Sequence, residues 1–139
     1  MTPVLALSER IEILKKVKNV AIVGVSNKAD RPSFGVTKWL LDNTDLNLFF
    51  VNPVITELFG KPVYKSLLEV PESIDLVDVF RNPKDMAPIM EDAIAIKAKI
   101  FWMQLGISEA QSAAKGMSAG LTVVEDACIK VDYEKLLLN

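Results

Sequence analysis

The sequence contains no histidine and only one cysteine, Cys128. Histidine is the usual general base, the common partner of serine and cysteine nucleophiles, and the commonest metal ligand. Its absence argues against those sites, and the sequence predicts no catalytic residue and no metal-binding residue. One cysteine excludes a disulfide within the chain. Because Cys128 follows Glu125-Asp126, we expect a buried structural thiol instead of a nucleophile.

The chain also has little net charge and no long apolar run. Sixteen Lys+Arg against 18 Asp+Glu give a formal charge of −2 at pH 7. Such a balance provides no basic field for nucleic acid or an anionic membrane. The N-terminus shows neither a signal peptide nor a long apolar span. We therefore expect a cytoplasmic protein with no nucleic-acid partner and no membrane partner.

What the chain does have is the composition of one folded domain. Its 139 residues are half hydrophobic and 24% charged, a profile typical of globular proteins. This length suits a single domain with one substantial core. The chain is too short for a cofactor domain plus a separate substrate domain. We expect residues 1–139 to form that domain.

Short apolar runs recur along the chain, and several are apolar at nearly every position. That pattern is typical of strands buried on both faces of a parallel sheet. The predicted strands are Val20–Val25, Leu48–Val51, Leu76–Phe80, Ile100–Met103 and Leu121–Val124.

Helical patterns precede the first run and separate the others. They cover Leu7–Val17, a segment that begins near Pro32-Ser33, a segment from Pro88 to about Ala98, and a segment introduced by the capping-box pair Ser108 and Gln111. The alternation predicts an α/β, Rossmann-like, doubly wound and mainly parallel five-stranded sheet with helices on both faces.

One segment interrupts this alternation after the second predicted strand. Residues 53–71 contain three prolines and Gly60, which favour turns. Within them we expect a small strand at Val63-Tyr64 and a helical turn at Ser66–Glu69.

The first predicted strand leads into the polar loop GVSNKADRPSFG. Against the G-x-G-x-x-G/A dinucleotide fingerprint, the loop offers Gly24, Ser26 and Ala29, which is a partial match. A serine hydroxyl, the Arg31 guanidinium and backbone N–H groups near Ser33 are suited to one or two phosphates. An equally open alternative is that Ser33 only caps a helix and Arg31 is a solvated surface charge.

The end of the second predicted strand tests for NAD. NAD sites usually place an acid there for the ribose hydroxyls, whereas this strand ends in Asn52-Pro53 and Glu57 lies beyond the proline. The sequence therefore disfavours ordinary NAD binding and favours an ADP-containing ligand held without an acidic contact.

Six segments in order carry a family resemblance: GVSNKADRPSFGV, VNP, FGKPVY, DLVDVFRNP, KIFWMQLGI and AGLTVVEDACI. From about Lys18 to Lys130 the chain resembles the small single-domain CoA-binding proteins. It is similar to the N-terminal CoA-binding domain of the succinyl-CoA synthetase alpha subunit. The resemblance implies a Rossmann-like fold that binds CoA or acyl-CoA across the strand ends.

The resemblance also implies a set of cofactor-binding positions, all of which follow predicted strands. They are Gly24, Val25, Ser26, Lys28, Arg31, Ser33 and Phe34 near the pyrophosphate, Asn52 and Pro53 near adenosine, Phe80 and Arg81 on the adenine side, and Gln104, Gly106 and Ile107 along pantetheine.

Several of these positions have structural alternatives. Phe80 could end a core strand, Arg81 could form a surface ion pair, Pro53 could stop a strand, and Gly106 could serve a tight turn. Trp102 and Met103 are expected to be buried and not to face a ligand.

One position departs from the family pattern. Where relatives commonly carry a base suited to the 3′-phosphate of CoA, this chain continues from Asn52-Pro53 with Val-Ile-Thr-Glu. Lys28 or Lys61 could compensate.

The sequence thus favours a CoA or acyl-CoA binding protein without intrinsic catalysis. The synthetase reaction needs a phosphohistidine on a second domain and a partner subunit, and this chain has no histidine. The alternative is an NAD(P)-binding Rossmann oxidoreductase or redox sensor. A third reading is a subunit that acts by protein contact, with the N-terminal helix and the apolar tail at 135–139 supporting a homodimer.

Overall fold

The computed structural model describes residues 5–138. Its helices are α1 (Leu7–Leu14), α2 (Pro32–Asn43), α3 (Met86–Ala95), α4 (Ala110–Ser118) and α5 (Ile129–Leu138), with 3-10 turns η1 (Leu67–Glu69) and η2 (Pro83–Asp85). Its strands are β1 (Asn19–Val23), β2 (Asn47–Val51), β3 (Glu57–Leu58), β4 (Lys61–Tyr64), β5 (Leu76–Val79), β6 (Ile100–Met103) and β7 (Thr122–Val124).

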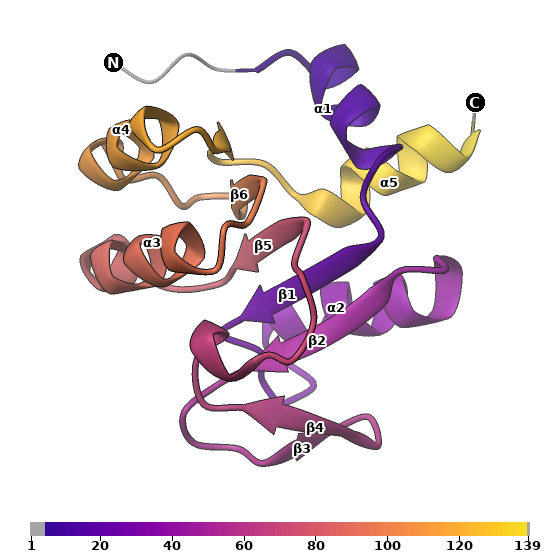
Figure 1. Cartoon of the computed structure of the whole chain (residues 1–139). Helices are drawn as coiled ribbons and strands as arrows, with labels where there is room; N and C mark the ends of the chain where they lie inside the picture. The colour runs from indigo at the N-terminus through magenta and orange to yellow at the C-terminus, as the bar shows by residue number, and fades with distance from the viewer. Residues whose placement is uncertain (1–4, 139) are drawn as a thin grey trace.

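The strands form one sheet in the order β3-β4-β2-β1-β5-β6-β7, which runs from bottom to top in Figure 1. Every neighbouring pair is parallel except β3 and β4. The Rossmann-like α/β class and the mainly parallel sheet are therefore confirmed. The expected number of five strands is wrong, because the segment after β2 adds β4 and β3 to the sheet edge. The expected small strand Val63-Tyr64 is the second half of β4.

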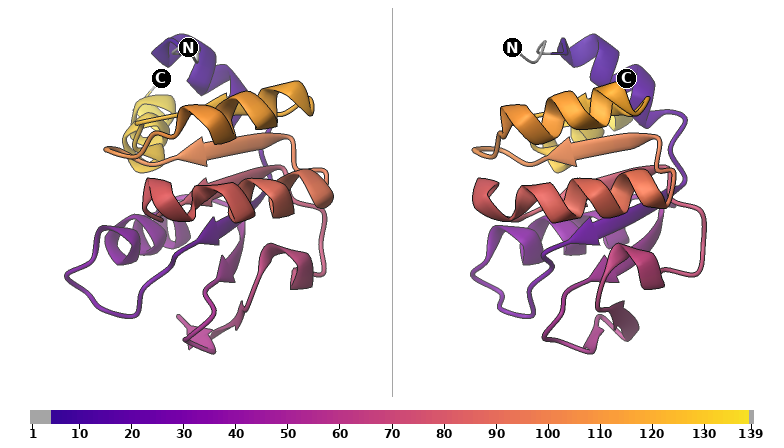
Figure 2. Two further views of the ribbon diagram at one scale, coloured as in Figure 1. Left: turned by 90° about the vertical axis from the view of Figure 1, so that its left-hand side faces the viewer. Right: turned by 60° about the vertical axis from the view of Figure 1, so that its left-hand side comes forward.

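Helices cover both faces of the sheet (Figure 2). Helices α3 and α4 lie on one face, and α2 and α5 lie on the other, with α1 beside α5. Successive residues of a strand point to opposite faces, so β6 sends Phe101 and Met103 into one core and Trp102 into the other. All three side chains are fully buried, which confirms the expectation for Trp102 and Met103.

The first and last helices, α1 and α5, pack together on the α2 side of the sheet. Residues 135–138 of the expected apolar tail belong to α5, a helix that packs against α1, and Asn139 lies outside the described residues. The Arg10 Nε atom of α1 donates to Asp132 Oδ2 of α5 at 2.7 Å, and Asp132 is buried. The two segments considered for a dimer thus pack on each other within one chain.

Two helix starts differ from the sequence expectation. Helix α3 begins at Met86 instead of Pro88, because η2 already turns the chain at Pro83. Helix α4 is capped by Glu109 and not by Ser108. The Glu109 carboxylate accepts from the backbone N–H groups of residues 111 and 112 at 3.1 and 2.7 Å, which satisfies donors that the first turn leaves open.

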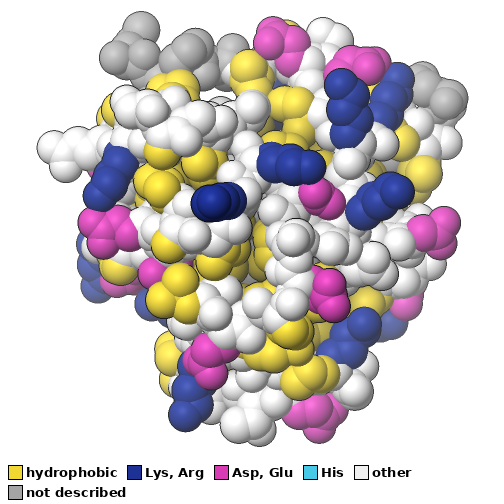
Figure 3. All heavy atoms as spheres, in the orientation of Figure 1, with side chains coloured by type: hydrophobic (Ala, Val, Ile, Leu, Met, Phe, Trp, Pro, Cys, Tyr) yellow, Lys and Arg dark blue, Asp and Glu magenta, His cyan; other side chains and the backbone are white. Residues whose placement is uncertain are grey.

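The surface shown in Figure 3 has basic and acidic side chains interspersed. Within residues 5–138, no helix combines the length and the apolar character needed to cross a membrane.

Candidate functional site

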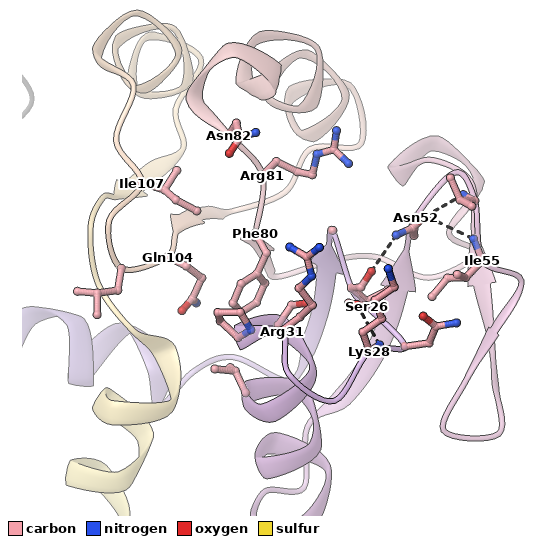
Figure 4. Close-up of a pocket in the computed structure, with 18 of the residues that line it drawn as sticks. Ser26, Lys28, Arg31, Asn52, Ile55, Phe80, Arg81, Asn82, Gln104 and Ile107 are labelled. Carbon is pink, nitrogen blue, oxygen red and sulfur yellow. Dashed lines mark hydrogen bonds between the residues drawn. The ribbon is translucent and has the colours of Figure 1, made fainter.

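A pocket of about 790 Å³ opens beyond the carboxyl ends of β1, β2, β5 and β6. This is the edge at which open parallel sheets bind ligands. All of the expected binding residues line it except Phe34 and Gly106. Figure 4 shows Gln104 and Ile107 at one end, Asn52 and Ile55 at the other, with Phe80 and Arg31 between them.

The two exceptions have structural roles. Phe34 turns away from the pocket and packs on Phe59, with ring centroids 5.0 Å apart. Gly106 has a φ of +83°, which favours glycine, and its N–H donates to Asp126 Oδ1 at 2.6 Å. Gly106 therefore serves a tight turn, which was the structural alternative for this position. Neither Phe34 nor Gly106 lines the pocket.

Gly24 closes the pocket floor at the point where β1 ends. Its φ is +89°, and a Cβ atom there would lie 2.5 Å from the Phe80 carbonyl oxygen. Its N–H donates to the Val51 carbonyl at 3.0 Å, which ties the turn to β2. A glycine is thus required both by the backbone angle and by the contact, and it keeps the loop after β1 against the end of β5.

The loop after Gly24 is ordered by its own hydrogen bonds. The Ser26 hydroxyl accepts from Lys28 N–H at 3.1 Å, and the Lys28 carbonyl accepts from Arg31 N–H at 3.0 Å. Arg31 is the N-cap residue of α2, and no side chain caps this helix start. The loop therefore delivers an uncapped helix N-terminus, which carries partial positive charge, to the pocket.

Ser33 does not cap the helix, because the helix begins one residue before it at Pro32. Only 5% of the surface of Ser33 is exposed, the residue lines the pocket, and its side chain makes no hydrogen bond with any residue in the range 5–138. Nearby, Lys28 and Arg31 have no carboxylate within salt-bridge distance in that same range. An unused hydroxyl in the pocket wall, two cations and a helix start together are suited to a phosphate or pyrophosphate.

Asn52 connects the loop after β1 to the loop after β2. Its Nδ2 donates to the Val25 carbonyl at 2.8 Å, and its Oδ1 accepts from Val54 N–H at 2.7 Å. The nearby Glu57 carboxylate accepts from Gly60 N–H at 3.0 Å in the β3–β4 turn. It does not line the pocket, so this end presents no acid for a ribose.

At the other end, Gln104 lines the pocket with only 3% of its surface exposed. Its Nε2 donates to Asp78 in the middle of the sheet, and its Oε1 accepts from Ile129 N–H at 3.4 Å at the start of α5. Burial raises the pKa of Asp78 to about 7, against the opposing effect of the hydrogen bond from Gln104. Gln104 thus joins the pocket wall to a buried acid and to the last helix.

Other lining residues were not singled out from the sequence. Val36, Val54 and Ile55 are apolar and carry no chemical signal, although the last two directly follow β2. Cys128 was expected to be buried, but it is half-buried and lines the pocket. The chain segment that leads into α5 brings it there from a distant part of the sequence.

Among residues 5–138, no group of three or more acidic or cysteine side chains gathers as a metal site would require. The fold and the pocket therefore define a class: a Rossmann-like α/β domain with an anion-suited pocket at the carboxyl ends of its strands. Residues 18–134 match the family described as CoA binding domain, and the chain belongs to that family.

Individual relatives agree with this assignment. The chain is 36% identical over 122 residues to the uncharacterized protein YneT of Bacillus subtilis, covering 88% of this chain and 90% of that one. A hypothetical protein from Pyrococcus horikoshii has the same fold with a TM-score of 0.89 and 35% identity, over 96% of this chain and 93% of the other. A 4-hydroxybutyrate–CoA ligase (ADP-forming) of Nitrosopumilus maritimus is 28% identical over 82 residues, 59% of this chain but 12% of the ligase.

Proposed function

We propose that this protein binds CoA or acyl-CoA in the strand-end pocket, as one domain that catalyses no reaction by itself. The observation that carries the proposal is the phosphate-suited group at the start of α2. There the Ser33 hydroxyl, Lys28 and Arg31 face a pocket in a chain that belongs to a CoA-binding family. In the bound complex we expect the pyrophosphate at this helix start.

The rest of the ligand would run along the pocket in both directions. Adenosine would lie toward Asn52 and Ile55, and the pantetheine arm would run past Phe80 toward Gln104 and Ile107, the order in which Figure 4 shows them. A volume of about 790 Å³ is within the range of cofactor pockets. Cys128 and Ile107 line the end where a thiol or an acyl group would arrive.

The proposal of binding without catalysis rests on the chemistry of the chain. Without histidine, the protein cannot form the phosphohistidine on which the synthetase reaction depends. The matching segment makes up only 12% of the ligase in which it also occurs. These observations favour a binding module that senses CoA or presents it to a partner.

An NAD(P)-dependent function has less support. The first acidic residue after β2 in the sequence, Glu57, accepts a hydrogen bond from Gly60 and lies outside the pocket. An acid at this position is what NAD sites use to hold the ribose hydroxyls.

Isothermal titration calorimetry with CoA, acetyl-CoA, NAD⁺ and NADH tests the proposal directly. We expect CoA or acetyl-CoA to bind with a micromolar or lower dissociation constant, and we expect neither dinucleotide to compete. Binding of NADH alone, or no heat with either CoA compound, would overturn the proposal.

The role of Arg31 is tested by Arg31→Ala, because a guanidinium can contact two phosphate oxygens at once. We expect CoA affinity to fall roughly tenfold or more. Lys38→Ala is the matched control, since it also removes one exposed positive charge from the α2 region, but from a pair with Asp42. Equal affinities for the two variants would remove Arg31 from the site.

A further inference from the structure

A second cavity, of about 410 Å³, lies beside the main pocket. The two share Gly24, Pro53 and Arg81 in their walls, so they meet along the ends of β1, β2 and β5. The second cavity continues on the other side of these strand ends, toward the residues after β4 and the start of α3. A ligand lying near Pro53 would therefore have a group within reach of both cavities.

Some charged residues of the second cavity form ion pairs and others do not. Arg81 donates to Asp85 Oδ2 at 3.2 Å, which leaves this arginine paired. Lys65 and Lys84 line the same cavity and are exposed, and neither has a carboxylate within salt-bridge distance in the described part of the chain. The remaining acid in the wall is Asp92, whose pKa is raised by burial and by the neighbouring charge of Glu91. Two ammonium groups thus remain for an anion.

Strand pairing explains why one of these lysines is well placed. Strand β4 runs parallel to β2, with Tyr64 opposite Val51, and Asn52 N–H donates to the Tyr64 carbonyl at 2.9 Å. Lys65 is the next residue, so it follows β4 at the level where Asn52-Pro53 follows β2. The three residues after Pro53 include no lysine or arginine. Lys65 reaches the same edge of the sheet because it follows the neighbouring strand, β4.

Lys61 cannot serve in this way. It begins β4, and a four-residue strand places it at the opposite end of the sheet. There it lines a separate hollow with Asn19 and Asn47, which begin β1 and β2. Of the two lysines suggested by the sequence, Lys61 is excluded from the strand-end site, and Lys28 lines the main pocket.

We propose that Lys65, assisted by Lys84, binds the 3′-phosphate of CoA in the second cavity and so distinguishes CoA from 3′-dephospho-CoA. This inference rests on the proposed function, because it places one group of the same ligand. The pyrophosphate would occupy the α2 side of the strand ends, and the phosphomonoester on the ribose would cross at Pro53 to the α3 side. Lys28 and Arg31 would then hold the pyrophosphate, and Lys65 and Lys84 would hold the 3′-phosphate.

Calorimetric titrations of CoA and 3′-dephospho-CoA into the wild type, Lys65→Gln, Lys84→Gln and the double variant test this inference. We expect the wild type to bind CoA about tenfold more tightly than 3′-dephospho-CoA. The double variant should lose most of this preference, while its affinity for 3′-dephospho-CoA stays as in the wild type. Lys61→Gln, at the opposite end of β4, is the matched control and should keep the full preference.

The outcomes separate this inference from the proposed function. If CoA binds but the double variant keeps the preference, the 3′-phosphate lies elsewhere, and loss of preference in Lys28→Gln would assign it to the main pocket. A wild type that binds both compounds equally also overturns the inference while leaving CoA binding intact. No binding of either compound to the wild type contradicts the proposed function itself. Thermal unfolding should be nearly unchanged in these variants, because both lysines are exposed.

Discussion

Two aspartates near opposite ends of β5 show how differently the two edges of this sheet are built. Asp75, at the amino end, accepts from the backbone N–H groups of Lys18 and Asn19 at 3.0 and 2.9 Å and lies 3.6 Å from Lys99 Nζ. Partial burial tends to raise its pKa, but the hydrogen bonds and the lysine together hold the pKa below its ordinary value. The charge of Asp75 is therefore stabilising.

Asp78, three residues further along, is fully buried, and Gln104 is its hydrogen-bond partner. Its Oδ2 atom has no partner within residues 5–138, and burial raises its pKa to about 7. Toward the carboxyl end there are also an unused serine hydroxyl and cations without acidic partners. Asp75 at the amino end is satisfied by its neighbours, whereas the carboxyl end keeps polar groups that a ligand can use.

The largest effect expected from a single substitution is that of Gly24→Ala, which should break the carboxyl end. The added Cβ would meet the Phe80 carbonyl at 2.5 Å in a backbone conformation with φ of +89°. We expect a loss of about 3 kcal/mol in the free energy of unfolding. CoA binding should weaken at least about tenfold, because Phe80 and Arg81 must move. Urea unfolding and calorimetry measure the two effects.

Gly60→Ala is the control for backbone strain alone. Gly60 also has positive φ, +75°, but no atom lies within 4 Å of its Cβ position, and it is outside the pocket. We expect about 1 kcal/mol of destabilisation and unchanged CoA affinity. If both variants lose the same stability and neither loses affinity, the contact at Gly24 has no role in the site.

The second prediction sharpens the difference between the two aspartates through pH. Asp78 has a pKa near 7 in the folded protein and near 3.8 when unfolded. Its contribution to the stability of the wild type is therefore largest at low pH. This stabilisation is lost as pH rises toward and through 7. Asp78→Asn cannot ionise. Relative to the wild type, it should gain on the order of 3 kcal/mol in unfolding free energy between pH 4 and pH 8.

Urea unfolding of both proteins at pH 4, 6 and 8 measures this gain. A stability difference that is independent of pH would show that Asp78 does not titrate in this range. If the variant instead loses stability relative to the wild type as the pH rises, the charged form of Asp78 is better stabilised than the structure indicates.

The smallest effect is expected at the amino end. Asp75 has a lowered pKa, so its contribution to stability is present above pH 4 and is lost as the pH falls below that value. Asp75→Asn should cost about 1 kcal/mol at pH 7 and almost nothing at pH 3. CoA affinity should not change, because Asp75 lies at the far edge of the sheet. Unfolding and titration of one sample at both pH values check all three statements, and a loss of CoA affinity would contradict the separation of the two ends.

The fold was largely readable from local patterns. The run VAIV and its counterparts are apolar at successive positions because helices cover both faces of the sheet, and each predicted run overlaps a strand of the structure. Strand β3 was missed because its two residues pair only after the chain has turned back at Phe59-Gly60. Helix α5 was missed because its amphipathic pattern is weak, and it packs on α1, a helix far away in the sequence.

The location of the candidate site was also readable, since ligands of parallel sheets lie where strands end. The roles of individual residues in the site were harder to predict from the sequence. Gly106 and Phe34 follow strands or loops of the right kind but serve a turn and an aromatic contact. Nothing local distinguishes Cys128, which reaches the pocket by the approach of the last helix.

By itself, the sequence determined the alternation of strands and helices and the loop GVSNKADRPSFG at the end of the first strand, because periodicity and glycine turns are local properties. Only the tertiary structure decided which charges have partners. Arg81 is paired with Asp85, Lys65 stands beside the end of β2, and Lys61 is at the opposite edge. The physical reason is that parallel pairing aligns the ends of strands far apart in the chain, and an anion site depends on which of those ends carry unpaired cations.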